Sequence, residues 1–385
     1  MSDIPLKNLL RERACPDNGP RSSRWPMLRL IVDRSSWNLA NRRYLVLPLL
    51  CLLLLASAIS ALAIGAVQVA VGDVLGILLQ IPGLNGSAEY SSTHVAVVQS
   101  IRLPRVLMGV LVGASLAMCG AALQGLFRNP LADPALVGVS SGAALGAVSV
   151  IVLSGSVLQG LARFAGAWLL PLAAFVGGVC VTLLVYRLAH RGGRTAVTTL
   201  LLAGIAVGSL SSAVTGLLTY MADDFQLRTL TFWSMGSLGG ATWSKLGAAS
   251  ILMLLALVLI PTQARALNAL LLGESEAMHL GFDLERVKRC LILLIALAVG
   301  AAVSVSGIIG FVGLVTPHLI RLAVGPDHRL LLPASALLGA SLLVLADLFA
   351  RTIVAPSELP IGIVTALVGG PFFLWLLVRL RGLST

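Results

Sequence analysis

The residues that could bind a nucleotide or a metal ion do not form the usual motifs in this sequence. A phosphate-binding loop needs a lysine directly after a glycine, and none of the three lysines, Lys7, Lys245 and Lys288, has that neighbour. A His-Glu metal motif is also absent. The sequence therefore predicts no catalytic residue and no metal site. If the protein uses ATP, another chain must bind it.

Charged side chains inside apolar segments would be the other candidates for chemistry. Asp347 and Arg351 are four residues apart near the expected outer end of an apolar span, where they could pair along one helix face. Transport driven by protons or sodium usually needs carboxylates near the middle of the membrane. The sequence offers no clear carboxylate of this kind, which counts against ion coupling.

One segment of mixed charge, residues 263–285, has the pattern of a protein-docking element. Gly273 separates two expected short helices, and Glu274 and Glu276 begin the second one. A helix that lies on a lipid surface would normally carry a more basic polar face. Two short helices with acidic residues are more typical of a segment that docks into a groove of another protein. Their expected apolar faces consist of Leu267, Leu270 and Leu271 in the first helix, and Ala277, Leu280 and Gly281 in the second.

The composition identifies the kind of scaffold that must carry this segment. The chain has 385 residues, of which 57% are hydrophobic and 11% are charged, whereas a soluble protein has about a quarter charged residues. The chain is therefore a membrane protein, and an ordinary cytosolic enzyme, a collagen, a disordered chain and a disulfide scaffold are excluded. The five cysteines are far apart in sequence and predict neither a zinc site nor a disulfide framework.

Apolar stretches long enough for membrane helices recur along the chain, since a span needs about 20 apolar residues. The 31-residue stretch Cys290–Ile320 is too long for one span, and we divide it at Ser304–Gly307. The fold predicted is an all-α polytopic membrane protein with ten transmembrane helices per subunit and both termini cytoplasmic. The other eight stretches are Leu45–Val67, Val106–Phe127, Ala135–Leu153, Phe164–Tyr186, Thr195–Tyr220, Leu246–Ile260, Leu330–Ala346 and Leu359–Val378.

The distribution of basic residues supports this topology. With ten spans and a cytoplasmic N-terminus, 21 of the 27 Lys and Arg residues fall on the cytoplasmic side, as the positive-inside rule requires. Nine of them lie in a basic cytoplasmic tail, residues 1–43, which precedes the transmembrane domain, residues 44–385. The tail has almost no aromatic residues for base stacking, so we expect no nucleic-acid partner. It is also too long for the n-region of a signal peptide.

Glycines four residues apart predict close helix packing in the lipid bilayer. Three spans contain such a pair, and close backbone approach provides packing energy where no hydrophobic drive exists. The pairs are Gly109 and Gly113, Gly142 and Gly146, and Gly204 and Gly208.

Several stretches together resemble a known family, the FecCD-type permease subunits of ATP-driven importers for iron-siderophores, haem and vitamin B12. They follow one another in the expected order from about residue 45 to the C-terminus. These stretches are Ile101–Arg105, Gln124–Pro134, Leu200–Gly204, Trp233–Leu238, Leu272–Gly281, Gly310–His318, Gly325–Arg329 and Glu358–Gly362.

The resemblance implies a transport subunit of the bacterial inner membrane rather than an enzyme. It implies a homodimer of ten-helix subunits around a central path, two ATP-binding subunits beneath it and a periplasmic substrate-binding protein above it. ATP and magnesium would bind to the ATPase subunits, and this chain would bind no cofactor. Residues Trp233–Trp243 most resemble the haem-importing members, so haem is the expected ligand, with a ferric siderophore or cobalamin as alternatives.

The resemblance also implies roles for individual residues. The coupling loop 263–285 would sit in the ATPase groove, three arginines would receive acidic residues of the binding protein, and four residues would form a cytoplasmic gate. The coupling residues are Leu267, Leu272, Gly273, Glu274, Glu276, Ala277, Leu280 and Gly281. The docking residues are Arg102, Arg105 and Arg351, and the gate residues are Asn129, Leu131, Val197 and Thr198.

Two alternatives remain open at this point. Arg102 and Arg105 could be ordinary span-end arginines whose charged groups reach the interface. The protein as a whole could be an ion-driven secondary transporter or channel, which would need midplane carboxylates and no docking loop.

Overall fold

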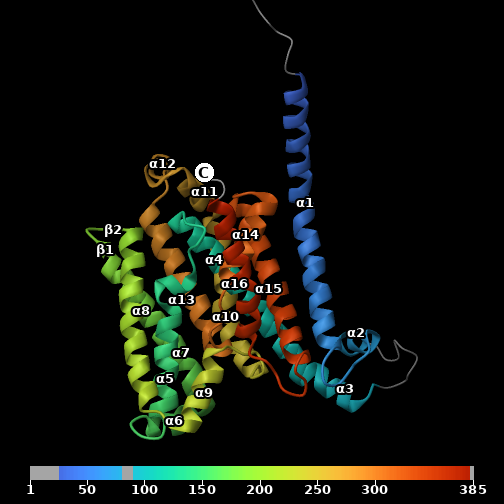
Figure 1. Ribbon diagram of the computed structural model, residues 1–385, viewed down its shortest axis with the longest axis vertical. Coiled ribbons are helices and arrows are strands. Elements are labelled where there is room, and N and C mark those ends of the chain that lie inside the picture. The colour runs from blue at the N-terminus through green and yellow to red at the C-terminus, as the bar shows by residue number, and fades with distance from the viewer. Residues whose placement is uncertain (1–25, 80–89, 382–385) are drawn as a thin grey trace, which may run out of the picture. The chain divides into compact units, whose positions relative to one another are not determined.

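The computed structural model describes residues 26–79 and 90–381, and nearly all of them are helical (Figure 1). The first 25 residues of the expected basic tail lie outside the described residues. The chain divides after Tyr44 into an N-terminal unit and a main unit, Leu45–Thr385. One short hairpin departs from the all-α expectation: strand β1, His190–Arg191, pairs antiparallel with β2, Arg194–Thr195.

The helices follow one another with short connections. The α-helices are α1 Pro26–Ala63, α2 Val71–Leu79, α3 Ser92–Ala96, α4 Leu103–Phe127, α5 Val139–Leu153, α6 Gln159–Ala165, α7 Leu169–Ala189, α8 Val197–Tyr220, α9 Asp224–Ser234, α10 Trp243–Leu259, α11 Ala264–Leu272, α12 Glu274–His279, α13 Leu284–Ser306, α14 Val312–Val324, α15 His328–Thr352 and α16 Ile361–Arg381. A π-helix, η1 Val97–Arg102, leads into α4, and three 3-10 turns are η2 Pro134–Val137, η3 Gly166–Trp168 and η4 Ile260–Gln263.

Seven helical segments of the described chain are long and apolar enough to cross a membrane. Three shorter apolar helices accompany them, Val139–Leu153, Val312–Val324 and Ile361–Leu374. Each of the ten expected apolar stretches falls on one of these segments. The structure is thus that of a polytopic helical membrane protein.

The break expected within Cys290–Ile320 is confirmed. Helix α13 ends at Ser306, and Gly307 takes a left-handed backbone conformation with φ of 70°, which glycine adopts without a Cβ clash. The carbonyl of Ser306 accepts a 2.7 Å hydrogen bond from the backbone N–H of Ser237. Helix α14 then begins at Val312, after a short link that ends at Phe311, whose φ is 67°.

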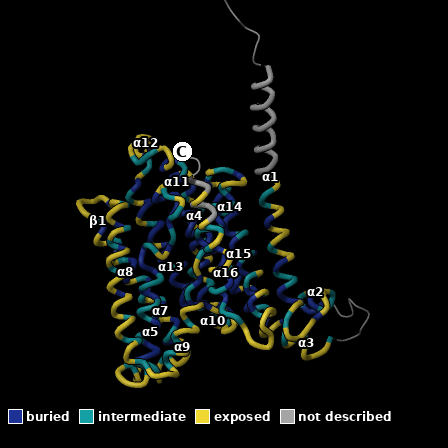
Figure 2. The backbone as a smooth tube through the Cα atoms, viewed as in Figure 1, coloured by how far each residue is buried: buried dark blue, intermediate teal, exposed yellow. Residues whose placement is uncertain are grey.

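The interior of the main unit is built around α4, which packs against α15, α14 and α13. Figure 2 shows α4 and α13 dominated by buried residues, while α8 consists mostly of exposed and half-buried residues. The predicted small-residue packing is confirmed at two contacts. A Cβ on Gly113 of α4 would overlap the Gly339 carbonyl of α15, and one on Gly142 of α5 would overlap the Gly177 carbonyl of α7.

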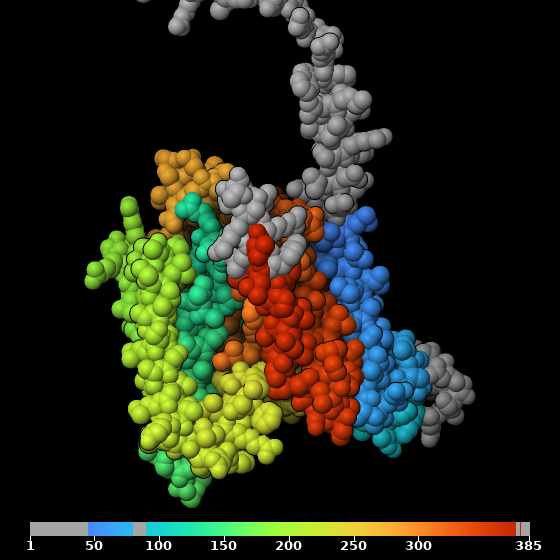
Figure 3. All heavy atoms as spheres, in the orientation of Figure 1, coloured from blue at the N-terminus to red at the C-terminus, as the bar shows by residue number. Residues whose placement is uncertain are grey.

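The connections gather at two opposite ends of the main unit (Figure 1). Helices α11 and α12 and the β1–β2 hairpin lie at one end, which we call the α12 end. Helices α2, α3, α6 and α9 lie at the other, which we call the α9 end. The segment of α11 and α12 stands out from the surface at the α12 end (Figure 3).

Candidate functional site

The α11–α12 segment has the two-helix form that the sequence predicts. Helix α11 ends at Leu272, and Gly273 turns the chain with φ of 127° before α12 begins at Glu274. A second positive-φ glycine, Gly281, ends the segment. The break between the helices therefore depends on a residue that tolerates this conformation.

The outer face of this segment is apolar and exposed. Leu272, Met278 and Leu280 are 69%, 56% and 61% exposed, whereas Gly273 and Glu274 are half-buried and Glu276 and Gly281 are exposed. Exposed apolar side chains that cluster on a projecting loop are typical of a protein-binding surface. We refer to Leu272, Met278 and Leu280 as the apolar knob.

Two of the expected coupling residues face the opposite way. Leu267 and Ala277 are fully buried in the hydrophobic core of this chain. Each lies on the helix face that packs inward, because the apolar face of a short surface helix is the face that covers the core. These two residues therefore support the knob from beneath, and their part in coupling remains a prediction.

A polar cluster fixes α11 to the start of α15. The Asn268 side chain donates to Asp327 Oδ1 at 2.6 Å and accepts from the backbone N–H of His328 at 2.8 Å. His328 is buried, and its Nδ1 lies 2.8 Å from the same Asn268 oxygen. The position of the knob thus depends on contacts that the sequence did not reveal.

The four expected gate residues lie on two segments. Asn129 closes a turn after α4, where its Oδ1 accepts from the backbone N–H of Leu131 at 2.9 Å. Val197 and Thr198 are the first two residues of α8. The turn η2, just after Leu131, packs against α8, where a Cβ on Gly204 would overlap a carbonyl of η2. The structure therefore joins these two segments, although their role as a gate remains a prediction.

The three expected docking arginines lie at the α9 end, Arg102 at the end of η1, Arg105 on α4 and Arg351 on α15, but their guanidinium groups have partners within the chain. Arg105 is buried and contacts two carboxylates. Its Nη2 lies 2.9 Å from Asp347 Oδ1, and its Nη1 lies 2.8 Å from Glu358 Oε1. Arg351 lies 4.0 Å from Asp347, so the pair expected within α15 forms, and Arg105 is the closer partner.

The other contacts of these arginines are to the end of α1. A helix leaves its last carbonyls without partners, and a cation there also meets the negative end of the helix dipole. Both guanidinium groups fill this role: Arg102 donates to the carbonyls of Leu62 and Ala63, and Arg351 donates to that of Ala61. Arg102 also donates to the carbonyl of Val67, in the connection that follows α1. Their docking role remains a prediction, and the accessible charge of this cluster belongs to Glu358, whose side chain is 46% exposed.

Glu358 is a site residue that the sequence did not predict, although it begins the stretch Glu358–Gly362, which carries part of the family resemblance. It lies in the connection between α15 and α16, and its hydrogen bond to Arg105 lowers the pKa of its carboxyl below the ordinary glutamate value. The signal that points to such a partner is the rule that a buried arginine must be paired.

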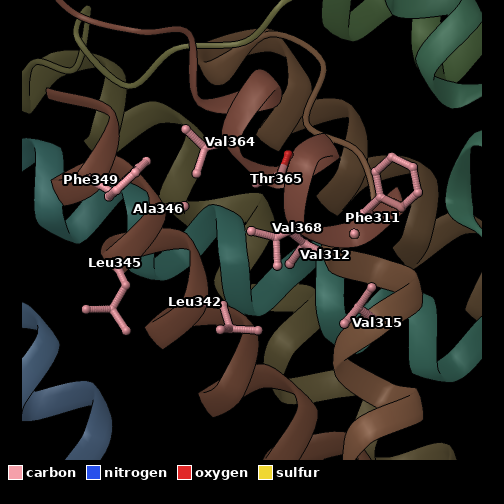
Figure 4. Close-up of a pocket in the computed structure, with 11 residues that line it drawn as sticks. Phe311, Val312, Val315, Leu342, Leu345, Ala346, Phe349, Val364, Thr365 and Val368 are labelled. Carbon is pink, nitrogen blue, oxygen red and sulfur yellow. The ribbon is translucent and has the colours of Figure 1, made fainter. Parts of the chain in front are cut away.

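Two other features lack the context of an active site. Residues 138–142 have the glycine spacing of a nucleophile motif around Ser140, but they begin α5 after the 3-10 turn η2 rather than after a strand. A groove of about 410 Å³ between α14, α15 and α16 has apolar walls apart from Thr365 (Figure 4). Among the described residues, no three His, Cys, Asp or Glu residues are grouped as metal ligands would be.

Comparison with known proteins gives a consistent result. The sequence pattern of the FecCD transport family matches residues 52–379. The hemin transport system permease protein HmuU of Yersinia pestis is 52% identical over 282 residues, which cover 73% of this chain and 83% of that protein. The cobalamin import system permease protein BtuC of Halobacterium salinarum is 47% identical over 285 residues, which cover 74% of each chain.

A third relative and a solved structure extend the similarity. The vitamin B12 import system permease protein BtuC of Vibrio cholerae is 45% identical over 302 residues, which cover 77% of this chain and 87% of that protein. A solved structure described as an inward-facing conformation of a metal-chelate type ABC transporter superposes with a TM-score of 0.74. It is 34% identical and covers 87% of this chain and 99% of its own.

Proposed function

The chain belongs to the FecCD transport family, as its motifs indicated, and we propose that it is the permease subunit of an ATP-driven importer that passes haem to the cytoplasm. Its relatives are transport permeases rather than enzymes. The observation that supports the proposal is the apolar knob: a chain without a nucleotide-binding loop has exposed apolar side chains on two short helices at one end of its bundle, as a docking surface for an ATPase would need.

The topology proposed has ten crossings with both termini in the cytoplasm. Seven helices of the described chain have the length of a span, two of the shorter apolar helices lie between long ones in the chain order, and the third, Ile361–Leu374, follows the last long one. The positive-inside distribution favours the α12 end as the cytoplasmic side, because the basic residues of the β1–β2 hairpin and of the start of α13 lie there.

The assembly proposed is a homodimer in the bacterial inner membrane, with two ATPase subunits at the α12 end and a periplasmic binding protein at the α9 end. Closed two-fold symmetry is the commonest arrangement of identical subunits, and it would put one knob on each ATPase. ATP and magnesium would bind to the ATPase subunits, and this chain would hold no cofactor. Arg102, Arg105 and Arg351 would contribute positive charge at the α9 end, and Asn129, Leu131, Val197 and Thr198 would form the gate.

Haem is the ligand proposed because the hemin permease of Yersinia pestis is 52% identical, against 47% and 45% for the two B12 permeases. The sequence between Trp233 and Trp243 also resembles haem importers. Cobalamin or a ferric siderophore would use the same assembly and is an outcome of the test below.

The alternative of ion-driven transport gains no support from the site. Asp347 is a buried carboxylate in an apolar helix, which such a mechanism could use, but it is already paired with Arg105. A carboxylate held by a guanidinium group within the chain is less available to bind and release a coupling ion.

The test is reconstitution in liposomes with haem, cyanocobalamin and a ferric siderophore as separate probes. The permease with its ATPase and binding protein should accumulate haem when ATP is supplied. The permease alone should neither hydrolyse ATP nor accumulate any probe under a proton or sodium gradient. Gradient-driven accumulation by the isolated chain would overturn the proposal, and ATP-driven uptake of cobalamin instead of haem would correct the ligand.

A further inference from the structure

A buried lysine connects three elements at the α12 end. Lys288 lies on the second turn of α13, and its side chain is 4% exposed. Its Nζ donates to the carbonyl of Thr195 at 2.9 Å and to Glu274 Oε2 at 3.0 Å, and it lies 3.5 Å from Glu285 Oε1. The three hydrogens of the ammonium group therefore meet acceptors on β2, on α12 and on α13 itself.

The strand residue Thr195 is held by α13 at several atoms. Its backbone N–H lies 3.0 Å from both oxygens of Glu285, and its hydroxyl donates to Glu285 Oε2 at 2.8 Å. Its carbonyl accepts from Lys288. The side chain of His190, on the paired strand, lies 2.9 Å from the same hydroxyl. Thr195 is therefore fixed to α13 through its amide, its carbonyl and its side chain.

Thr195 lies close in the chain to the start of α8. Thr195 ends β2, and Ala196 alone separates it from Val197, the first residue of α8 and an expected gate residue. Any movement of Thr195 must therefore be transmitted through two peptide units to the start of α8.

The link to α12 is a single ion pair. Glu274 is the first residue of α12, and its side chain is 40% exposed. Among the described residues, its contact with Lys288 is the one side-chain hydrogen bond or ion pair that joins α12 to another element. The remaining attachment of α12 is apolar, through the buried Ala277.

A buried lysine is a poor device for stability alone, because apolar residues of similar volume often serve a core as well or better. The arrangement here has a different property. Glu285, which belongs to α13 rather than to α12, lies 3.5 Å from the ammonium group, so Lys288 keeps a negative partner if Glu274 moves away. The cluster can thus open at α12 without leaving an unpaired buried charge, which is the requirement for an element with two stable arrangements.

We infer that Lys288 is the joint through which displacement of α12 reaches the β1–β2 hairpin and the start of α8. This inference rests on the proposed function, because it assigns to the joint the coupling of ATPase movement to the gate. When the Glu274 pair is closed, α12, α13 and the hairpin move as one body. When it is open, the hairpin is released from α12 and stays attached to α13.

The test uses the complete importer in liposomes and measures the number of ATP molecules hydrolysed per ligand imported. Glu274→Gln removes the charge of one partner and leaves Lys288 paired with Glu285, so this variant should fold normally. Lys288→Met removes the joint, and Lys288→Arg retains its charge. We expect the first two variants to raise the ATP cost per ligand at least about threefold, and Lys288→Arg to restore much of the coupling.

The matched control is Arg286→Met, which removes a cation two residues away on the same helix. Arg286 is 85% exposed and pairs with Asp283 at 2.7 Å, with no contact to the joint. This variant should hydrolyse the same number of ATP molecules per imported ligand as the wild type. The double variant Glu274→Gln with Lys288→Met should be no worse than Lys288→Met alone, because both changes remove the same link.

Hydrogen exchange of the β1–β2 hairpin gives a readout that a purely structural role would leave unchanged. In the wild-type importer, exchange at residues 190–196 should change when ATP and vanadate trap the ATPase subunits, and in Glu274→Gln this change should disappear. A working importer in which Glu274→Gln and Lys288→Met keep both the wild-type ATP cost and the nucleotide-dependent exchange overturns the inference. A wild-type assembly that imports none of the three probes overturns the proposed function, and with it this role for the joint.

Discussion

Arg105 on α4 holds Asp347 on α15 through two nitrogens, with Nε 3.0 Å from Oδ2 and Nη2 2.9 Å from Oδ1. Both side chains are nearly inaccessible, and the residues are 242 positions apart in the chain. This bidentate geometry is the strongest form of an ion pair between side chains. It makes Arg105 a structural partner of α15 in this conformation.

Breaking this pair on one side should be costly. Asp347→Asn leaves the buried Arg105 with Glu358 as its one remaining carboxylate, and Arg105→Met leaves Asp347 with Arg351 at 4.0 Å. Loss of a buried partner costs about 3–5 kcal/mol when the other charge is left unpaired, so the expected loss here is up to that size. Thermal unfolding of the purified permease in detergent would measure it. The double change to Met and Leu should recover most of the loss. Single variants as stable as the wild type would show that the pair is not buried in the membrane-embedded protein.

The Glu358 carboxyl should make stability depend on acid pH. Its folded-state pKa is lowered by the hydrogen bond to Arg105, so its contribution is present at neutral pH and is lost as the pH falls through that folded value. The ordinary glutamate pKa is about 4.3, so the loss should occur below that pH. Because the side chain is 46% exposed, the effect should stay below about 1 kcal/mol.

Glu358→Gln provides the comparison for this effect. The variant should unfold at a lower temperature than the wild type at pH 7, and the difference should shrink as the pH falls through the lowered folded-state pKa of Glu358, because the wild-type carboxyl then becomes protonated. A difference that stays constant across this range would mean that the ion pair with Arg105 does not contribute.

The apolar knob should carry the affinity for the ATPase. Leu272→Ala and Leu280→Ala each remove most of an exposed leucine side chain, and full burial of leucine contributes about 1.5–3 kcal/mol. Each variant should therefore bind the ATPase subunit roughly tenfold more weakly or worse, measured with the permease in nanodiscs. Arg286→Ala, exposed at the same end, is the control and should bind normally.

Substitution of Ala277 should affect the packing of α12 rather than test contact with the ATPase directly. A bulky charged residue at this buried position would first disturb the packing of α12, so loss of transport in Ala277→Glu would not identify a contact with the ATPase. The leucine variants avoid this ambiguity, since their side chains face outward. Unchanged ATPase binding in both of them would remove the knob from the interface.

Charge reversal of Arg102, Arg105 and Arg351 should weaken capture of the binding protein, with the larger effect at low salt, where electrostatic attraction between the two proteins is least screened. The contacts with α1 and Asp347 add a second expectation: each reversal should also lower the unfolding temperature. Binding that is unchanged at low ionic strength in a folded triple variant would leave these arginines with a structural role alone.

The features that could be predicted from the sequence are those set by residues close together in the chain. The break at Gly307 and the two helices separated by Gly273 follow from glycine next to apolar periodicity, which a sequence displays directly. The pair of Asp347 and Arg351 was visible because the two residues share a helix face. The Arg105–Asp347 contact was not, because it depends on how α4 and α15 pack, and no local pattern records that.

The same reasoning applies to the coupling segment. Its helices were predicted, but the inward direction of Leu267 and Ala277 was not, because amphipathicity identifies an apolar face without saying whether the core or a partner covers it. Lys288 was counted as one basic residue of a cytoplasmic loop, and its burial against Thr195 appears in the folded chain alone.

The contact between Gly113 and Gly339 bears on which parts of the permease can move during a transport cycle. Where two helices touch through their main chains, no side-chain rotamers lie between them to rearrange, and sliding one past the other would force backbone atoms together. Helices α4 and α15 should therefore keep the same position relative to each other while the permease changes between its outward-open and inward-open states. The change in shape would then fall to helices such as α8, which meets its neighbours along a smaller part of its surface.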